Sequence, residues 1–321
     1  MSKYQLQVKE INKVFSSGFL INKTQFKAVN NVSFNLKAGE VIAIVGESGS
    51  GKSTTARMIT NLIKPTSGEI LFEGTNIKEK KFQKELPERF QMIFQDPFAA
   101  LNPNHTIGYA IGRPLKLKNK TEGSIREKVI ELLTLVGLTP AEDFIEKYPY
   151  QISGGQKQRV VIARVLGLEP EIIVADEPTS MLDVSIGIDI MNLLLDLKEK
   201  RNLSYILITH NLASARYMAD RIMVMYAGEI VEIGDCEDVI NSPKHPYSKL
   251  LLQSSPDPWQ TNDEQIDFIE PLDTNKLDKG CKFQFRCPYA TEQCRNSEIS
   301  LYKLVDEREV RCNLYEKVED R

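Results

Sequence analysis

Apolar and polar residues alternate in short runs along the first part of the chain. The runs Leu6 to Val8, Val32 to Phe34 and Val41 to Val45 have the length and composition of strands, with turn residues such as Gly39 between them. The pattern therefore predicts a β-rich beginning over about residues 4–45.

A helical pattern follows this β-rich part. Ala56, Ile59, Leu62 and Ile63 recur at helical spacing, and Pro65 is expected to end the helix. Because an apolar run comes directly before and an amphipathic helix comes after, the segment between them is predicted to be a strand-to-helix turn.

The middle of the chain changes to helical periodicity, between about residues 96 and 165. Its clearest segment is the amphipathic EKVIELLTLVGL of residues 127–138, which Gly137 and Pro140 close. This stretch predicts an inserted helical subdomain.

Strands and helices alternate again in the second half. Ile172 to Ala175 and Tyr205 to Ile208 are expected to be strands, whereas the apolar stripe from Ile186 to Leu197 and the run Leu212 to Ala219 are expected to be helices. Such alternation predicts a parallel sheet with flanking helices.

The last third contains a predicted hairpin and a predicted boundary. Two β runs, Ile222 to Tyr226 and Glu229 to Ile233, meet at a glycine-containing turn. Pro, Asp and Asn then cluster without periodicity from Ser254 to Gln265. We therefore expect one domain over residues 1–255 and a second, smaller region over residues 256–321.

Composition narrows the class of protein. A chain of 321 residues with 41% apolar residues can bury a full core, and a net charge of −3 without a basic stripe argues against nucleic acid as the main partner. The apolar runs are far shorter than the roughly 20 residues that span a bilayer, and the segment MSKYQLQVKE lacks the apolar stretch expected of a signal peptide. The sequence predicts a cytosolic, soluble chain. In such a chain the five cysteines are expected to be free thiols or metal ligands rather than disulfides.

The segment GESGSGKST has the spacing of a phosphate-binding loop. Its glycines let backbone N–H groups face phosphates, Lys52 reaches the β and γ oxygens, and the Ser53 hydroxyl coordinates magnesium. A glycine-rich turn that matches by chance is the alternative, and the strand before and helix after make it the poorer one. The expected nucleotide contacts here are Gly46, Ser48, Gly49, Gly51, Lys52, Ser53 and Thr54.

Polar side chains follow two of the predicted parallel strands. Asp176 is placed to hold the magnesium shell, and Glu177 is the candidate general base for the attacking water. His210 ends the next strand, and beside Glu177 it is expected to contact the γ-phosphate. Alone, the acids would be a solvated strand end and the histidine a structural residue, but the phosphate loop favours catalytic roles.

With these motifs and the segment ISGGQ in order along the chain, residues from about Lys3 to Pro256 resemble the ATP-binding subunits of ABC transporters. The resemblance implies an α/β fold, a P-loop ABC ATPase cassette whose RecA-like core carries antiparallel β and helical subdomains, with a small Cys-rich C-terminal extension. It also implies that ATP is hydrolysed between two cassettes, because the signature of one binds the γ-phosphate held by the other. The signature residues are Ser153, Gly154, Gly155 and Gln156.

The resemblance supplies further site residues. Gln95 matches the glutamine that touches magnesium and senses the membrane subunit, and Asp183 closes a D-loop in which Met181 replaces the more usual Ala. Phe15 is expected to stack on adenine, with Phe19 as a rival and a core role as the other alternative. The magnesium set is thus Ser53, Gln95 and Asp176, and the catalytic set is Glu177, His210 and Gln95.

Three stretches, FQDPFAALNP, SPKHPYSKLLL and the cysteine-rich end, resemble the oligopeptide and dipeptide importer branch, in its F-type subunit. That branch implies a second, different ATPase subunit, two permease subunits, an extracellular solute-binding protein and a peripheral position on the cytoplasmic face of the membrane. Related systems import oligosaccharides or metal chelates, so the resemblance leaves the solute open.

Four cysteines near the end form a C-x5-C-x6-C-x17-C pattern. Zinc sites use tighter cysteine pairs, and Cys-Pro occurs in bacterial ferredoxins, so a 4Fe-4S cluster is favoured over zinc. Free cysteines in a docking tail are the third alternative. The candidate ligands are Cys281, Cys287, Cys294 and Cys312.

Together these features predict an ATPase that drives import of peptides or a related solute through an ABC membrane complex. One rival is a soluble ABC ATPase of translation or DNA repair, but neither a second cassette nor a long coiled-coil insertion is present in this sequence. Another is an iron-sulfur electron-transfer module, which the complete ATPase set disfavours.

Overall fold

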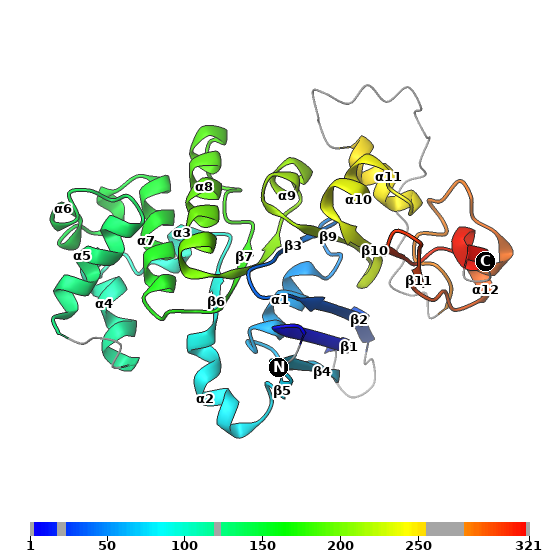
Figure 1. Cartoon of the computed structure of the whole chain (residues 1–321), viewed down its shortest axis with the longest axis horizontal. Coiled ribbons are helices and arrows are strands. Elements are labelled where there is room, and N and C mark those ends of the chain that lie inside the picture. The colour runs from blue at the N-terminus through cyan, green and yellow to red at the C-terminus, as the bar shows by residue number, and fades with distance from the viewer. Residues whose placement is uncertain (1–2, 18–23, 119–122, 255–278, 319–321) are drawn as a thin grey trace. The chain divides into compact units, whose positions relative to one another are not determined.

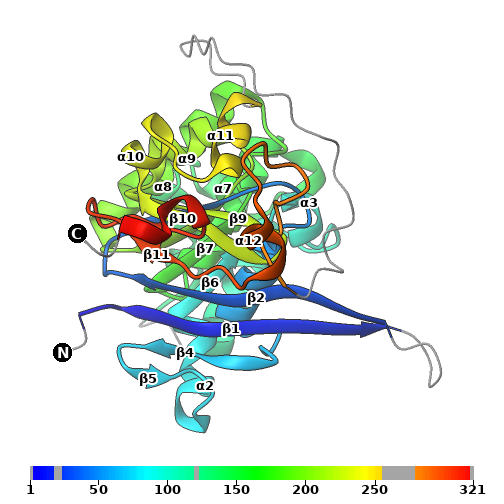
Figure 2. The same ribbon diagram turned by 90° about the vertical axis from the view of Figure 1, so that its right-hand side faces the viewer.

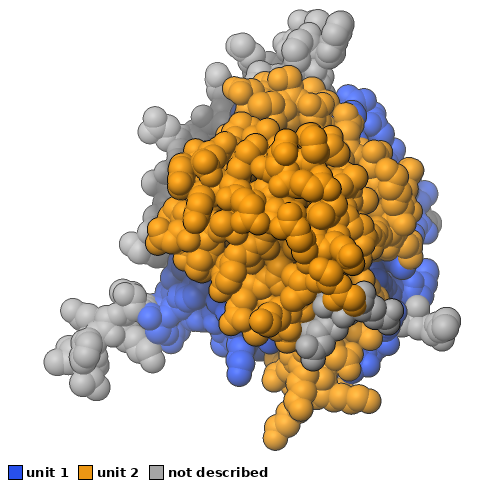
Figure 3. Space-filling model, turned by 90° about the vertical axis from the view of Figure 1, so that its left-hand side faces the viewer, with its two compact units in different colours: residues 1–77, 207–321 blue, residues 78–206 orange. Residues whose placement is uncertain are grey.

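The computed structural model describes residues 3–17, 24–118, 123–254 and 279–318. These residues form two compact units, which Figure 3 colours separately. Unit 1 comprises Met1–Ile77 and Leu207–Arg321, and unit 2 comprises Lys78–Ile206. Each unit is described by itself.

An antiparallel sheet of order β2-β1-β4-β5 belongs to unit 1, and β2, β1 and β4 lie side by side in Figure 2. Leu6, Val8 and Ile11 of β1 are buried, and register shifts around Glu10, whose φ is 48°, bend the strand. The four strands are β1 (Leu6–Ser17), β2 (Thr24–Leu36), β4 (Ser67–Phe72) and β5 (Thr75–Asn76).

A second sheet of unit 1 is mixed, with the order β11-β12-β10-β9-β3. All five residues of β3 are buried, as expected of a central strand, and β3 pairs in parallel with β9. Ala227 and Gly228 join β9 to β10 with φ angles of 45° and 85°, which suits a tight hairpin turn. The strands are β3 (Val41–Val45), β9 (Arg221–Tyr226), β10 (Glu229–Asp235), β11 (Tyr302–Lys303) and β12 (Glu309–Val310).

The described helices of unit 1 are short. They are α1 (Lys52–Ile59), α9 (Leu212–Met218), α10 (Cys236–Asn241), α11 (Pro246–Gln253), α12 (Glu292–Asn296) and the 3-10 helix η3 (Asn313–Val318). Figure 1 shows the C-terminal strand β11 and helix α12, in orange and red, beyond β10.

A buried charged cluster fastens the C-terminal strands to the rest of unit 1. Glu232 of β10 is fully buried, and Arg308 lies within 4.0 Å of its carboxylate. Arg308 also pairs with Asp306 and donates to the carbonyl oxygens of Asp238 and Ser242, at 2.9 and 2.7 Å. The guanidinium therefore links β10, α10 and the strand β12 that pairs with β10.

Unit 2 holds the strands β6 (Phe90–Ile93) and β7 (Ile172–Asp176), which pair in parallel. The chain crosses from unit 2 into unit 1 within β8 (Ser204–Ile208). Helices α3, α4 and α5 pack against α7, whose Val160 to Ala163 are buried. The helices are α2 (Lys80–Arg89), α3 (Pro97–Ala100), α4 (Ile107–Lys118), α5 (Ile125–Leu135), α6 (Glu142–Ile145), the 3-10 helix η1 (Pro149–Gln151), α7 (Gly154–Leu166) and α8 (Val184–Arg201).

The predicted elements are present, with different limits. The expected strands near residues 6–8 and 32–34 are parts of much longer strands, and the helix expected to stop at Pro65 already ends at Ile59. The predicted helical stretch of residues 96–165 lies inside unit 2, which extends beyond it at both ends, from Lys78 to Ile206. The domain boundary near residues 254–265 falls outside the described residues except for Ser254, so it stays a prediction.

Among the residues that the structure describes, no helix combines the length and apolar character that crossing a bilayer needs.

We predict that Arg308→Ala lowers the free energy of unfolding by about 3 kcal/mol, because it leaves the buried Glu232 carboxylate without its cationic partner. Chemical denaturation followed by circular dichroism measures this loss. The matched control is Arg295→Ala, an exposed arginine in the same C-terminal region. Equal stability of the two variants would show that the buried pair contributes nothing.

Candidate nucleotide site

The phosphate loop of unit 1 follows β3 and leads into α1, as the sequence predicts. Gly46 and Gly51 have φ angles of 146° and 100°. A Cβ on Gly46 would lie 2.2 Å from the carbonyl oxygen of Met225, and one on Gly51 would lie 2.5 Å from that of Ala28. Backbone packing, together with positive φ, thus excludes a side chain at both positions.

The ammonium of Lys52 is held over this loop. Its Nζ donates to the carbonyl oxygens of Gly46 and Glu47, both at 2.7 Å, and the side chain is buried. Lys52 is the first residue of α1, which begins after Gly51 in the left-handed conformation. The loop therefore presents backbone N–H groups, a helix N-terminus and one cation, the equipment of an anion site.

His210 follows β8 in unit 1. The N–H of the preceding Thr209 donates to the carbonyl of Ile44 at 3.2 Å, which places this turn beside the end of β3 that leads into the phosphate loop. Asn211 caps α9, because its side-chain oxygen accepts from the N–H groups of Ala213 and Ser214. Asparagine is among the residues that cap helices best, and this cap fixes the turn that carries His210.

The acidic residues lie at the end of β7 in unit 2. Asp176 is buried, and Glu177 adopts a left-handed backbone with φ of 48°. The side-chain amide of Gln95 donates to the Glu177 carboxylate at 2.7 Å. The structure thus brings together Gln95 and Glu177, two residues that the sequence places 82 positions apart.

The signature segment opens α7 in unit 2. Ser153 is the N-cap, with its hydroxyl accepting from the N–H of Gln156 at 3.3 Å while the Gln156 side chain accepts from the Ser153 N–H at 3.0 Å. This reciprocal pair is a capping box, which fixes the first turn. A Cβ on Gly155 would lie 2.7 Å from Ile186 of α8, so the glycine permits close helix packing.

The other predicted phosphate-loop residues, Ser48 and Gly49, are exposed, and Ser53 and Thr54 in the first turn of α1 are half-buried. Two further predicted site residues, Asp183 and Phe15, are exposed. Asp183 is the N-cap residue of α8, and Phe15 of β1 pairs with Phe26 with 43% of its surface exposed. The Lys13 ammonium lies 5.2 Å from the centre of the Phe15 ring. An exposed ring is open to stacking, so the adenine role of Phe15 stays a prediction, and its rival Phe19 lies outside the described residues.

The four cysteines that the sequence marks as metal ligands lie in the C-terminal part of unit 1, where the N–H of Cys281 donates to the carbonyl of Cys294 at 2.8 Å. Burial, with a smaller contribution from the neighbouring thiols, raises the pKa of Cys281 to about 12 and that of Cys312 to about 11. In the described parts of the chain no three His, Cys, Asp or Glu side chains are grouped so that they could hold a metal ion. The predicted 4Fe-4S or zinc site therefore has no support in this arrangement of Cys281, Cys287, Cys294 and Cys312.

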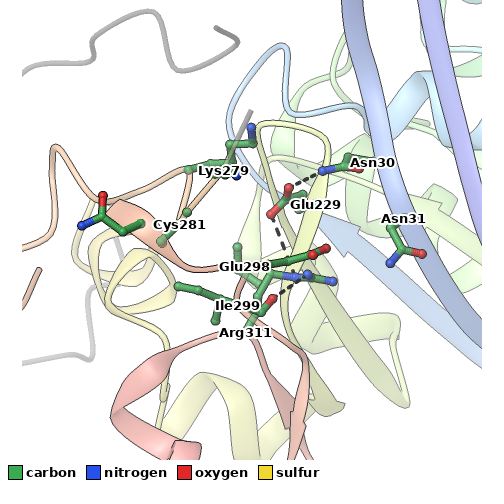
Figure 4. A pocket seen from close by; sticks show the side chains of 12 residues that line it. Asn30, Asn31, Glu229, Lys279, Cys281, Glu298, Ile299 and Arg311 are labelled. Carbon is green, nitrogen blue, oxygen red and sulfur yellow. Dashed lines mark hydrogen bonds and ion pairs between the residues drawn. The ribbon is translucent and has the colours of Figure 1, made fainter. Parts of the chain in front are cut away.

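A pocket of about 390 Å³ lies in unit 1 between β2, β10 and the C-terminal region, and Figure 4 shows it. Asn30 donates to the Glu229 carboxylate, and Arg311 lies 4.0 Å from that carboxylate while donating to the carbonyl of Ile299 at 2.9 Å. Because these polar groups are already engaged within the wall, we assign the pocket no ligand.

Comparisons with known proteins agree with this geometry. Residues 29–180 match the family described as ABC transporter, and residues 231–294 match the C-terminal region of oligopeptide/dipeptide transporters. The chain is 42% identical over 322 residues to an oligopeptide transport ATP-binding protein of Bacillus subtilis, with 97% of each chain covered. The chain belongs to the ABC transporter ATP-binding proteins, in the oligopeptide/dipeptide branch.

Other relatives of this ABC ATPase carry similar names. A di/tripeptide transport ATP-binding protein of Pseudomonas aeruginosa is 42% identical over 306 residues, with 93% of each chain covered. A dipeptide transport ATP-binding protein of Haemophilus influenzae is 42% identical over 318 residues, covering 96% of this chain and 94% of that one. The Pseudomonas protein is named DppF and the Haemophilus protein DppD, so the F-type assignment stays a prediction.

Solved structures confirm the predicted P-loop ABC cassette fold. CbiO1 of Clostridium perfringens, part of an ABC transporter complex, matches with a TM-score of 0.65 and 31% identity over 75% of this chain and 92% of that one. The dimeric bacterial ABC transporter cassette MJ0796 matches with a TM-score of 0.63 and 33% identity over 72% of this chain and 98% of that one.

We predict that Glu177→Gln lowers ATP turnover by about 100-fold, because the amide cannot take the proton of the attacking water. Nucleotide affinity is expected to remain, since no positive charge is lost. Turnover of the ABC ATPase assembly and equilibrium binding of a fluorescent ATP analogue measure the two effects. Near-normal turnover would remove Glu177 from the role of general base.

We predict that Lys52→Ala weakens MgATP binding by at least about 10-fold, because it removes the cation expected to neutralise the β- and γ-phosphates. Titration calorimetry measures the affinity. The control is Arg57→Ala, which deletes an exposed cation on the same helix, α1. Unchanged affinity in the Lys52 variant would contradict the placement of the phosphates on this loop.

Proposed function

We propose that this chain is the ATP-hydrolysing subunit of an importer that carries peptides or a related solute, such as an oligosaccharide or a metal chelate. The proposal rests mainly on the similarity, along 97% of the chain, to a relative named as an oligopeptide transport ATP-binding protein. The match to the C-terminal region of oligopeptide/dipeptide transporters supports the same branch.

The proposed roles divide between binding and proton transfer. Lys52 and the loop N–H groups hold the phosphates, and phosphate-loop contacts also fall to Ser48 and Thr54. Glu177 takes the proton of the attacking water, while Gln95 orients its carboxylate through the 2.7 Å hydrogen bond. His210 contacts the γ-phosphate.

Magnesium fits the donor set that we propose for it. Ser53, Gln95 and Asp176 all offer oxygen atoms, which this hard cation prefers. When bound, the ion neutralises charge on the β- and γ-phosphates.

We propose that each hydrolytic site needs a second cassette. The capping box at Ser153 fixes the N-terminus of α7, which supports its use as an anion-binding end directed at nucleotide held by the partner. Asp183 is proposed to lie at the same interface. The dimeric structure of the related cassette MJ0796 supports pairing of cassettes in general.

The full complex, in this proposal, contains a second, different ATPase subunit, two permease subunits and an extracellular solute-binding protein. The chain would act at the cytoplasmic face of the membrane as a peripheral subunit. An ABC ATPase of translation or DNA repair is not favoured, because the relatives reported above are named as transport proteins.

We propose separately that the four cysteines form a Cys-rich C-terminal extension that binds a 4Fe-4S cluster, with zinc as the alternative metal. This proposal rests on the spacing of the four cysteines in the sequence and on one main-chain contact between two of them, the hydrogen bond from the Cys281 N–H to the Cys294 carbonyl at 2.8 Å. Since no three described ligands are in position, metal binding requires these side chains to move together.

We predict about four iron atoms and matching sulfide per chain after anaerobic purification. Cys287→Ser should reduce the metal content and destabilise the C-terminal region more than it alters nucleotide affinity, because the thiol lies outside the nucleotide motifs. Stoichiometric zinc would replace the cluster while keeping the ligands. Metal-free chains with an ordered C-terminal region would exclude both metals.

We predict that the isolated chain is mostly monomeric and hydrolyses ATP slowly, because each site borrows its signature from a different subunit. Co-purification with the permease subunits, followed by turnover assays with and without the second ATPase subunit, tests this proposal. Robust turnover by the chain alone as a homodimer would contradict it. Recovery with ribosomes or DNA instead would favour the rival function.

A further inference from the structure

The second residue of the phosphate loop, Glu47, is contacted from the distant C-terminal region. Its carboxylate accepts three hydrogen bonds from the two terminal nitrogens of Arg286, each at 3.1 Å. The two residues are 239 positions apart in sequence, and both belong to unit 1. This fork-to-carboxylate geometry is the strongest form of ion pair that arginine makes.

The main chain of Glu47 is fixed as well. Its N–H donates to the hydroxyl of Tyr247 at 2.8 Å, and its carbonyl accepts from Lys52 at 2.7 Å. Three different groups therefore hold one residue of the loop, and two of them, Arg286 and Tyr247, come from outside the nucleotide motifs.

Arg286 is itself held in place. Only 10% of its side chain is exposed, whereas Glu47 is 42% exposed. The guanidinium carbon lies 5.5 Å from the ring centre of Phe283 and 5.9 Å from that of Tyr226. Phe283 and Tyr247 are almost fully buried, with ring centres 5.5 Å apart, so the arginine emerges from a packed aromatic cluster.

Tyr247 belongs to the stretch SPKHPYSKLLL, and His245 of the same stretch holds it in place. His245 is fully packed, and burial lowers its pKa to about 3, so the imidazole is neutral and its Nδ1 accepts from the Tyr247 N–H at 3.0 Å. The main-chain N–H of His245 donates to the buried Glu232 carboxylate at 2.9 Å. This cap anchors the start of α11, and with it the tyrosine that touches the phosphate loop.

The ion pair between Arg286 and Glu47 matters because Glu47 places a negative charge in a loop that is expected to bind phosphates. A carboxylate within a loop that holds a polyanion repels the phosphates unless a cation neutralises it. Arg286 supplies that cation. The ammonium of Lys52 donates instead to the carbonyl oxygens of Gly46 and Glu47. Loss of Arg286 would leave the negative charge of Glu47 uncompensated and free its side chain to move.

We infer that Arg286 is a positioning residue for nucleotide binding, which acts through Glu47 and makes the C-terminal region a working part of the phosphate site. The inference rests on the proposed phosphate role of the loop. The chemical group it serves is the triphosphate of the nucleotide, and its effect should be larger for the more highly charged ATP than for ADP.

The test is a double-mutant cycle in the full chain, with MgATP and MgADP affinities measured by titration calorimetry at low and high salt. Arg286→Ala should weaken MgATP binding about 10-fold, and MgADP binding less, with the gap narrowing at high salt. In a Glu47→Gln background the same arginine substitution should have much less effect, because the repelling charge is absent. Arg286→Lys should restore part of the affinity.

Turnover of the assembled complex gives a second readout. Arg286→Ala should raise KM for ATP and leave kcat close to normal at saturation, since the residue does not touch the reacting atoms. The matched control, Arg295→Ala, deletes an exposed arginine of the same region. Circular dichroism of all variants checks that each is folded.

The outcomes separate the inference from its premise. If Lys52→Ala weakens binding but Arg286→Ala does not, the inference fails while the phosphate loop stands. An equal loss from Arg286→Ala in both Glu47 backgrounds would also overturn it, because the arginine would then act only by keeping the region folded. If Lys52→Ala changes nothing, the proposed site itself fails.

Discussion

The close approach of backbone to backbone at the phosphate loop is the constraint on which unit 1 depends. Gly46 lies against the carbonyl of Met225 at the end of β9, and Gly51 lies against that of Ala28 in β2. The N–H of Gly228, in the turn between β9 and β10, donates to the carbonyl of Ser50 at 3.0 Å. The loop is therefore shaped by β2, β9 and the β9–β10 turn, which are far apart in the sequence.

This packing explains why regions without any nucleotide motif bear on the site. The β9–β10 hairpin packs against the phosphate loop through Met225 and Gly228. Strand β10 of this hairpin also pairs with β12 of the C-terminal region. From the same region, Arg286 reaches the Glu47 carboxylate. The C-terminal region thus contacts the phosphate loop through Arg286 and the neighbouring hairpin through β12.

Much of the fold follows from local sequence. Val41–Val45 and Ile172–Asp176 are continuous apolar runs whose strand character needs no tertiary information, and the glycine spacing after Val45 locates the turn. The first two strands were underestimated, because polar residues and the register shifts near Glu10 interrupt their alternation. Helix limits differ for a similar reason, since α1 ends at Ile59 while apolar residues continue beyond it.

The site could be predicted only as far as motifs define it. The phosphate loop, Glu177 and the signature helix were located by residue type and spacing. The hydrogen bond from Gln95 to Glu177 and the ion pair from Arg286 to Glu47 join residues 82 and 239 positions apart. Such pairs depend on packing that a single sequence does not contain. Cysteine spacing likewise suggested a metal site, but spacing says nothing about where the sulfur atoms point.

The central claim is that this ABC ATPase holds its nucleotide on the phosphate loop and completes the site with a second cassette. A structure of the assembled complex trapped with MgATP tests it most directly. The account predicts that Lys52 contacts the β- and γ-phosphates, that Glu177 faces the γ-phosphate, and that the first turn of α7 approaches nucleotide held by the partner. A γ-phosphate enclosed by this chain alone, without any signature helix from a second subunit, would contradict it.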